Sequence, residues 1–153
     1  MKIVILGTAY PYRGGLATFN ERLARQFQAE GHDVEVVTFT LQYPSFLFPG
    51  KTQYSNEVAP TDLRIKRWVN SCNPFNWVSV GRKIRKMQPD MLITCYWMAF
   101  FAPCYGIIER IVKGNGKTRC LALVHNMIPH EPSLLDKMFA PFYVKSTDGF
   151  VAL

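Results

Sequence analysis

The first 27 residues constrain the fold more than any other stretch of the chain. An apolar run, 2–6, is followed by a loop of turn-forming residues, 7–15. Apolar residues at helical spacing come next and predict one buried helix face: Leu16, Phe19, Leu23 and Phe27. A buried strand that passes through glycines into a helix leaves free backbone N–H groups at the helix start, where the helix dipole adds partial positive charge. Gly14 and Gly15 carry no side chain, so a ligand can approach this backbone closely. The pattern predicts either a phosphate-binding turn or a tight connection in which glycine only relieves steric crowding.

The glycine spacing excludes two common nucleotide-binding motifs. No Gly-Lys-Ser/Thr follows the loop, so it is not a P-loop. Gly7 and Gly14 lie too far apart for the dinucleotide fingerprint G-x-G-x-x-G. Arg13, Gly14 and Gly15 remain as candidate binding residues.

Strands and helices alternate along the rest of the chain. Further strands are expected at 33–38, 63–69, 91–95, 117–124 and 150–153, and further helices begin near Asn73, Phe100 and Ser133. The alternation predicts an α/β fold: a Rossmann-like, doubly wound, mainly parallel sheet with helices on both faces. The strand at 63–69 alternates apolar and basic residues and is expected at or near a sheet edge. Pro141 is expected to kink the last helix or end it early.

Two apolar stretches need their own interpretation. The segment 91–108 is nearly free of charge, but Pro103 and Gly106 interrupt it, so we expect a buried strand and a buried helix rather than a membrane span. The loop at 39–61 is long and rich in aromatic residues and proline. It is expected to line an acceptor site, to dip into a bilayer surface, or to cover the core.

The composition describes a globular chain with a basic excess. Hydrophobic residues make up 48% and charged residues 19% of the 153 residues, enough for one domain with a core. A formal net charge of +7 favours an anionic partner. The helix that begins near Asn73 carries a basic cluster with no intervening acidic residue, which predicts either a solvated face or contact with anionic lipid: Arg82, Lys83, Arg85 and Lys86. The basic residues match no nucleic-acid reader motif, so no nucleic-acid partner is expected.

Cysteine and histidine spacing gives no metal site. The four cysteines lack C-x-x-C spacing and are expected to be reduced, mostly buried thiols of a cytoplasmic protein: Cys72, Cys95, Cys104 and Cys120. His130 and Glu131 lack the H-E-x-x-H pattern and a third ligand. The start of the chain does not read as a signal peptide. We therefore predict no bound metal and a cytoplasmic location.

Three candidate binding segments follow predicted strands, and parallel strands would bring them to one sheet edge, where ligands bind in open α/β sheets. They are the glycine loop, Tyr96-Trp97 and the segment 125–131. His125 can hydrogen-bond a sugar hydroxyl or orient a phosphate leaving group, or it is an ordinary satisfied histidine at a strand end. Glu131, for which no metal-binding pattern is found, can stabilise the N-terminus of the following helix through its negative charge. His125 is the candidate catalytic residue. The candidate substrate-binding residues are Arg13, Gly14, Gly15, Tyr96, Trp97, Asn126 and Glu131.

Two segments resemble a known family. MKIVILGTAYPYRGGLATFNERLARQFQAEGHDVEVVTF and LVHNMIPHE are similar to the N-terminal domain of GT-B-fold retaining glycosyltransferases, close to glycosyltransferase family 4. The resemblance spans residues 1–153 as the acceptor-side half of a two-domain enzyme. It implies that a C-terminal domain outside this sequence binds a nucleotide-diphosphate sugar and carries two glutamates in an E-x7-E pattern. It also implies that Gly14 and Gly15 approach the donor diphosphate or the acceptor, and that His125 contacts the transferred sugar.

The resemblance implies a bacterial-type hexosyltransferase of glycan biosynthesis that acts with retention on a glycan or lipid-linked acceptor. No cofactor is expected on this domain, which would dock peripherally on the inner membrane. The apolar strand at 150–153 suggests a domain cut from a longer protein, and the chain alone is expected to be inactive. Two alternatives stay open: a non-catalytic α/β binding module that works with a partner subunit, and a nucleotide-dependent oxidoreductase or epimerase.

Overall fold

The computed structural model describes residues 1–44, 53–125 and 134–153. Its centre is a six-stranded sheet in the order β3-β2-β1-β4-β5-β6, and every pairing between these strands is parallel. The predicted Rossmann-like α/β fold is thus confirmed. The strands are β1 Lys2–Leu6, β2 Asp33–Leu41, β3 Ile65–Asn70, β4 Met91–Tyr96, β5 Arg119–Val124 and β6 Gly149–Ala152. The helices are α1 Gly15–Ala29, α2 Pro74–Met87, the short 3-10 helix η2 Ala99–Phe101, α3 Ala102–Lys113 and α4 Leu134–Val144.

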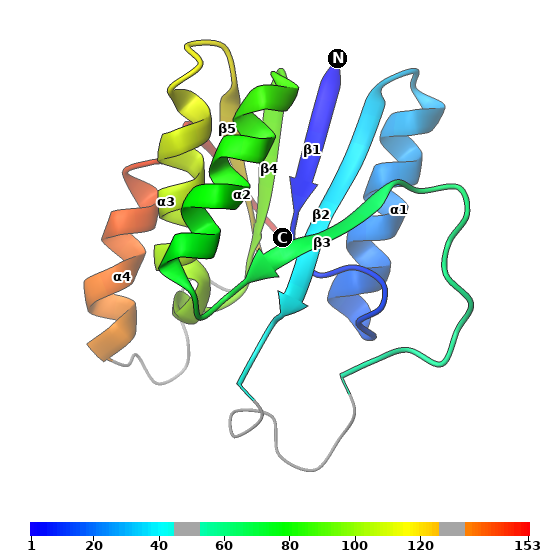
Figure 1. The fold of residues 1–153 in the computed structure, drawn as a ribbon, viewed down its shortest axis with the longest axis horizontal. Coiled ribbons are helices and arrows are strands. Elements are labelled where there is room, and N and C mark those ends of the chain that lie inside the picture. Colours follow the sequence, from blue (N-terminus) through cyan, green and yellow to red (C-terminus); the bar gives the residue numbers. More distant parts are fainter. Residues whose placement is uncertain (45–52, 126–133) are drawn as a thin grey trace.

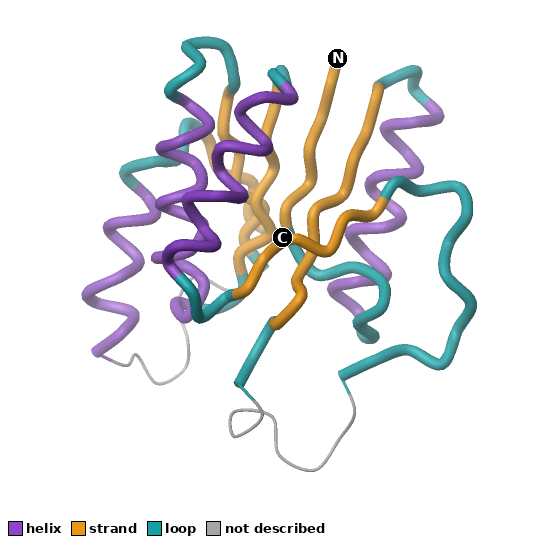
Figure 2. Tube along the Cα trace, viewed as in Figure 1, coloured by secondary structure: helices purple, strands orange, loops and turns teal. Residues whose placement is uncertain are grey.

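Helices cover both faces of the sheet (Figures 1 and 2). Alternate residues of β1 point to opposite sides: Ile3 and Ile5 pack with Ala24 of α1, whereas Val4 and Leu6 join the core beneath α2 and α3. α4 lies beside α3 on the same side as α2. The sheet is therefore doubly wound, with α1 on one face and α2, α3 and α4 on the other.

The direction of winding reverses between β1 and β4. From β1 the chain extends the sheet through β2 to β3, and after crossing back it extends the other side from β4 through β5 to β6. In open parallel sheets this reversal leaves a crevice at the carboxyl ends of the strands, where ligands bind. The end of β1, the end of β4 and the loops that follow them are the places to look for a site.

Gly7 closes the end of β1 tightly against its neighbours. Its N–H donates to the Val37 carbonyl at 3.1 Å. A methyl group added at Gly7 would lie 2.7 Å from Cβ of Cys95 on β4 and 3.0 Å from Nδ2 of Asn20 on α1. Only a residue without a side chain fits this meeting point of β1, β4 and α1.

Several sequence-based expectations are confirmed in this structure. The apolar segment 91–108 divides into β4, η2 and the first part of α3, as expected. β3 lies at one edge of the sheet. In the described part of the chain, no helix is long and apolar enough to cross a membrane.

Two expectations differ from the structure, and a third is narrowed to one of its two outcomes. β2 continues to Leu41 because its end pairs with Val69 and Asn70, so the long loop begins later than predicted. The buried face of α1 consists of Ala17, Asn20 and Ala24, whereas Phe19, predicted on that face, is 37% exposed. Of the two effects expected of Pro141, early termination does not occur: α4 runs on to Val144, because packing of the buried Tyr143 outweighs the local cost of proline.

Replacing Gly7 by alanine tests the tight junction. We expect Gly7→Ala to lower the free energy of unfolding by about 1–3 kcal/mol, because the added methyl group overlaps Cys95 and Asn20. Gly15→Ala is the matched control: nothing lies within 4 Å of its added methyl group, so stability should stay within about 1 kcal/mol of the parent. Urea denaturation measures both. Equal losses for the two variants would contradict the packing argument.

Candidate functional site

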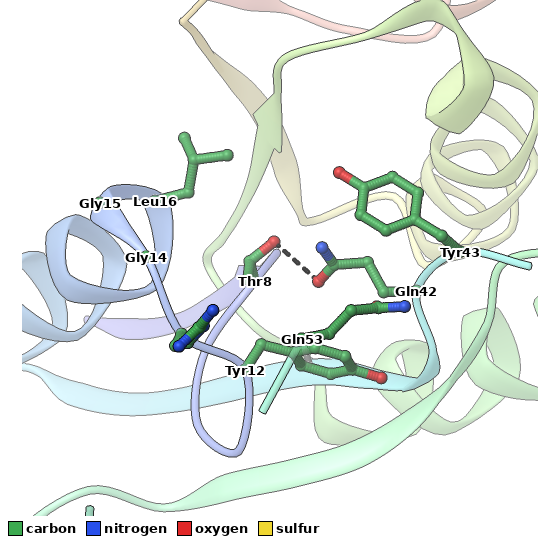
Figure 3. A pocket seen from close by; sticks show the side chains of 9 residues that line it. Thr8, Tyr12, Gly14, Gly15, Leu16, Gln42, Tyr43 and Gln53 are labelled. Atoms are coloured by element: carbon green, nitrogen blue, oxygen red, sulfur yellow. Dashed lines mark hydrogen bonds between the residues drawn. The ribbon is translucent and has the colours of Figure 1, made fainter. Parts of the chain in front are cut away.

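A pocket of about 450 Å³ opens at the carboxyl edge of the sheet, beside the point where the winding reverses (Figure 3). Its walls come from the β1–α1 loop, the residues that follow β2, and the segment that begins at Gln53. Figure 3 shows Gln42 and Tyr43 on the side opposite Gly14, Gly15 and Leu16, with Thr8 between them. The lining residues are Thr8, Tyr12, Arg13, Gly14, Gly15, Leu16, Gln42, Tyr43 and Gln53.

The start of α1 leaves backbone donors available at this pocket. Gly14 is the N-cap with φ 119° and ψ 175°, a conformation suited to glycine, and it provides no side-chain cap. The first turn carries no acidic residue, and nothing lies within 4 Å of a methyl group placed on Gly14 or Gly15. The first N–H groups of a helix have no partner within the helix, and the dipole makes this end electropositive. The pocket therefore offers an open, positively polarised backbone surface.

The segment that begins at Gln53 is clamped onto the glycine loop. The Arg13 N–H donates to the Gln53 carbonyl at 3.0 Å, and the Ser55 N–H donates to the Pro11 carbonyl at 2.7 Å. The rings of Tyr12 and Tyr54 stack with centroids 5.4 Å apart. The guanidinium carbon of Arg67 lies 5.9 Å from each ring centroid, so a cation from β3 supports the stack. This clamp fixes the position of Gln53 in the pocket wall.

Uncharged hydrogen-bonding groups line the opposite wall. The Thr8 hydroxyl donates to Oε1 of the buried Gln42 at 3.1 Å. The Trp97 indole N–H donates to the Tyr43 hydroxyl at 3.0 Å and so holds that ring at the pocket. The described lining contains no carboxylate, and Arg13 supplies its only formal charge. Hydroxyl, amide and aromatic groups beside one cation suit a polyhydroxylated ligand that carries an anionic group.

His125 lies at the end of β5, on the same edge of the sheet as the glycine loop. Its backbone N–H donates to the Tyr96 carbonyl at 2.9 Å. Its ring meets Phe19 of α1 edge to face, with centroids 5.2 Å apart. Nε2 is buried without a hydrogen-bond partner among the described residues, and burial lowers the pKa of the imidazole. A neutral ring with one unused nitrogen thus stands beside α1, although it does not line the pocket itself.

The remaining predicted residues take different positions. The Tyr96 side chain is 1% exposed and stacks on Tyr143 at 4.8 Å, and burial raises its pKa to about 12. It therefore belongs to the core rather than to the pocket surface. Trp97 lies behind the pocket and positions Tyr43. Asn126 and Glu131 lie outside the described residues.

Six residues that line the pocket are not among the candidates named from the sequence: Thr8, Tyr12, Leu16, Gln42, Tyr43 and Gln53. The last three belong to the loop at 39–61, for which lining an acceptor site was one of three expectations. Thr8 directly follows Gly7 at the end of a strand, which is a signal that could have identified it. Gln42 and Tyr43 directly follow β2, but ending that strand at residue 38 placed them inside a long loop. Gln53 reaches the pocket only through the clamp, which joins segments far apart in the sequence.

The described residues contain no group of three or more histidine, cysteine or acidic side chains placed to hold a metal ion. The cysteines are free, and three of the four are buried as expected, with Cys72 exposed. Of the aromatic loop, Phe39 lies in the core, while Tyr43 and Tyr54 support the pocket. Phe46 and Phe48 lie outside the described residues.

A parallel sheet of this order, with a glycine turn and a pocket at its reversal point, defines a Rossmann-like domain of the kind that forms one half of a GT-B glycosyltransferase. The family model for Glycosyltransferase Family 4 matches residues 13–153, and the chain belongs to this family. A comparison with curated proteins found no match.

Solved structures share the fold at low sequence identity. An alpha-glucosyltransferase bound to UDP and to DNA that contains a HMU base is 14% identical with a TM-score of 0.60; the match covers 98% of this chain and 37% of that chain. An alpha-glucosyltransferase (AGT) in complex with UDP is 15% identical with a TM-score of 0.59, over 99% of this chain and 35% of that chain. The chain thus spans little more than a third of these two glucosyltransferases.

The titration of His125 tests its surroundings. We expect its pKa, measured by NMR of the ring resonances, to lie below the ordinary value of about 6.5. Because the folded state binds the proton less well than the unfolded chain, the contribution of His125 to stability is complete above the unfolded pKa and declines as the pH falls toward the folded pKa.

A His125→Gln variant should remove this part of the pH dependence of unfolding, and the NMR signal that it loses identifies the His125 ring. His32→Gln is the matched control and should leave this part of the pH dependence in place. A His125 pKa at or above 6.5 would contradict the burial described here.

Proposed function

We propose that this chain is the acceptor-side half of a retaining glycosyltransferase that moves a hexosyl group from a nucleotide-diphosphate sugar to a glycan or lipid-linked acceptor. The family assignment supports sugar transfer as the reaction class. The observation that carries the proposal is the uncapped start of α1 at an open pocket, with Arg13 beside it. Such a site attracts an anionic group without needing a metal ion.

The proposed reaction breaks the bond between the sugar and the diphosphate and forms a bond from the sugar to an acceptor hydroxyl oxygen, whose proton passes to the departing diphosphate. Negative charge develops on the departing nucleoside diphosphate, and fixed N–H donors stabilise such charge when water is excluded. In the proposal, the backbone at Gly14 and Gly15, together with Arg13, faces this anion or an anionic group of the acceptor. The donor itself would be bound mainly by a second domain.

The opposite wall would orient the acceptor. Gln42, Gln53 and the Tyr43 hydroxyl can exchange hydrogen bonds with sugar hydroxyl groups. Holding two reactants at a fixed geometry is the main contribution that a half-site can make to such a reaction. His125, neutral and with Nε2 unused by the described residues, would hydrogen-bond the transferred sugar.

An oxidoreductase or epimerase fits less well. The strand order of this sheet occurs in dinucleotide-binding domains, but the loop after β1 lacks the G-x-G-x-x-G spacing that brings a pyrophosphate onto such a turn. A non-catalytic module that works with a partner subunit would share the pocket. It differs in one measurable respect, because joining it to a donor-binding domain would not produce sugar transfer.

Arginine substitutions in the complete two-domain protein test the anion site. We expect Arg13→Gln to lower kcat/KM for sugar transfer by about 10- to 100-fold, the loss typical of a hydrogen bond to a charged group. Arg22→Gln is the matched control, because Arg22 is also exposed and lies on α1, away from the lining of the pocket. Its kcat/KM should stay within about twofold of the parent.

Residues 1–153 alone should show no transfer from a nucleotide-diphosphate sugar. Transfer by this chain alone, or equal losses for Arg13→Gln and Arg22→Gln, would contradict the proposal. Absence of transfer by the two-domain protein with every donor tested would favour the non-catalytic module.

A further inference from the structure

Phe19 lies at the surface of α1 rather than on its buried face. That face consists of Ala17, Asn20 and Ala24, and Asn20 anchors the helix by donating its amide N–H to the Thr8 carbonyl at 2.8 Å. Phe19 precedes Asn20 and is 37% exposed, so its ring contributes only part of its area to packing. Because Asn20 fixes the rotation of the helix, it also fixes the direction in which the neighbouring Phe19 leaves the backbone.

The ring of Phe19 meets the imidazole of His125 at the carboxyl edge of the sheet. Their centroids lie 5.2 Å apart and their planes are perpendicular, at 90°. Rings in this arrangement attract each other through the edge of one and the face of the other. The backbone N–H of His125 donates to the Tyr96 carbonyl at 2.9 Å. His125 is therefore held from two sides, by the end of β4 through its backbone and by α1 through its ring.

The imidazole needs this support because one of its nitrogens is removed from water. Nε2 of His125 is buried and forms no hydrogen bond with the described residues. Burying a polar atom without such a bond costs free energy, so other contacts have to keep the ring in place. The perpendicular contact with Phe19 is one that does so.

A second phenylalanine and histidine pair on the same helix provides a comparison. The rings of Phe27 and His32 lie 6.0 Å apart with an interplanar angle of 72°. Phe27 also packs against the apolar cluster on this face of the sheet, and Nδ1 of His32 lies 3.0 Å from the amino group of Met1 in a hydrogen bond. β2 begins directly after His32, so this pair lies at the amino edge of the sheet. Of the two pairs, the one at the carboxyl edge lies where ligands bind in such sheets.

We propose that Phe19 is a positioning residue for sugar transfer: it holds the His125 imidazole at the carboxyl edge so that the ring meets the transferred sugar in one fixed orientation. The inference rests on the role proposed above for His125, and it adds a residue on which that role depends. Phe19 acts through His125 and does not itself have to touch the sugar. Such support matters for rate, since a displacement of about 1 Å at a reacting group can cost about 100-fold.

NMR of residues 1–153 tests the contact. Phe19→Leu removes the ring but keeps an apolar side chain. It should shift the His125 ring resonances and raise the His125 pKa toward the ordinary value of about 6.5, because water reaches the imidazole more easily. Phe19→Tyr keeps the ring, and its hydroxyl can reach water at this exposed position, so the His125 pKa should stay at the parent value. Phe27→Leu is the matched control: it should shift the His32 resonances and leave those of His125 unchanged.

Kinetics of the complete two-domain protein test the positioning, measured as release of nucleoside diphosphate from a panel of UDP- and GDP-hexoses. Phe19→Leu should lower kcat by about 10-fold and leave KM for the donor within about twofold, because the donor would be bound mainly by the second domain. Phe19→Tyr and Phe27→Leu should keep kcat within about twofold of the parent. In a His125→Ala background, Phe19→Leu should have no further effect, since a residue that acts through His125 then has nothing to position.

The outcomes separate this inference from the proposed function. Parent kcat in Phe19→Leu, an equal loss in the His125→Ala background, or unchanged His125 resonances would overturn the role of Phe19 while sugar transfer by the parent stands. Absence of nucleoside diphosphate release by the parent with every donor would contradict the proposed function itself, and this inference with it. Thermal unfolding of each variant controls for stability. Phe27 packs against the core, so Phe27→Leu should destabilise the domain at least as much as Phe19→Leu, and a loss of kcat confined to Phe19→Leu cannot be an effect of folding.

Discussion

The contact between the end of β1, β4 and α1 is the constraint on which the binding edge depends. Asn20 is fully buried on α1, and it satisfies its amide by donating to the Thr8 carbonyl at 2.8 Å and by accepting from the Cys95 thiol at 3.0 Å. Burying an amide is costly unless both ends find partners, so this arrangement is favourable only when α1 sits directly over the gap beside Gly7. The position of α1 in turn determines where Gly14 and Gly15 present their backbone.

Two of the helices that begin at this edge, α1 and α2, differ in how their first N–H groups are capped. α2 has Asn73 as its cap and Pro74 in its first turn, so its start is satisfied locally. α1 starts after Gly14, which provides no side-chain cap. The nearest carboxylate on the helix, Glu21, accepts a hydrogen bond from the Tyr10 N–H at 2.8 Å and does not cap the helix start. Because the start of α1 has no side-chain cap, its first N–H groups can bind a ligand. The open space around Gly14 and Gly15 supports this interpretation, because no packing within the described domain requires glycine at residue 15.

The sequence predicted the alternation of strands and helices well because each element carries a strong local pattern. β1, β4 and α2 were located within one or two residues, since their apolar periods and their flanking glycine, proline or asparagine residues agree. β2 was predicted too short, because Phe39 and Leu41 are held in the strand by pairing with β3, which is distant in sequence. The pocket wall was harder still. Gln42 and Gln53 become neighbours of the glycine loop through tertiary contacts that no local pattern records.

The two surfaces of interest use charge differently, and this difference follows from their backbone surroundings. At the pocket, one arginine and a helix start provide a small, directed positive region suited to a single anionic group. Along α2, the cations Arg82, Lys83 and Lys86 form a broad positive region without ion-pair partners among the described residues. A compact region can orient one ligand, whereas a broad one attracts an extended anionic surface with little geometric demand. The Ser71–Gln42 hydrogen bond ties the start of α2 to the pocket wall, so the two positive regions keep a fixed position relative to each other.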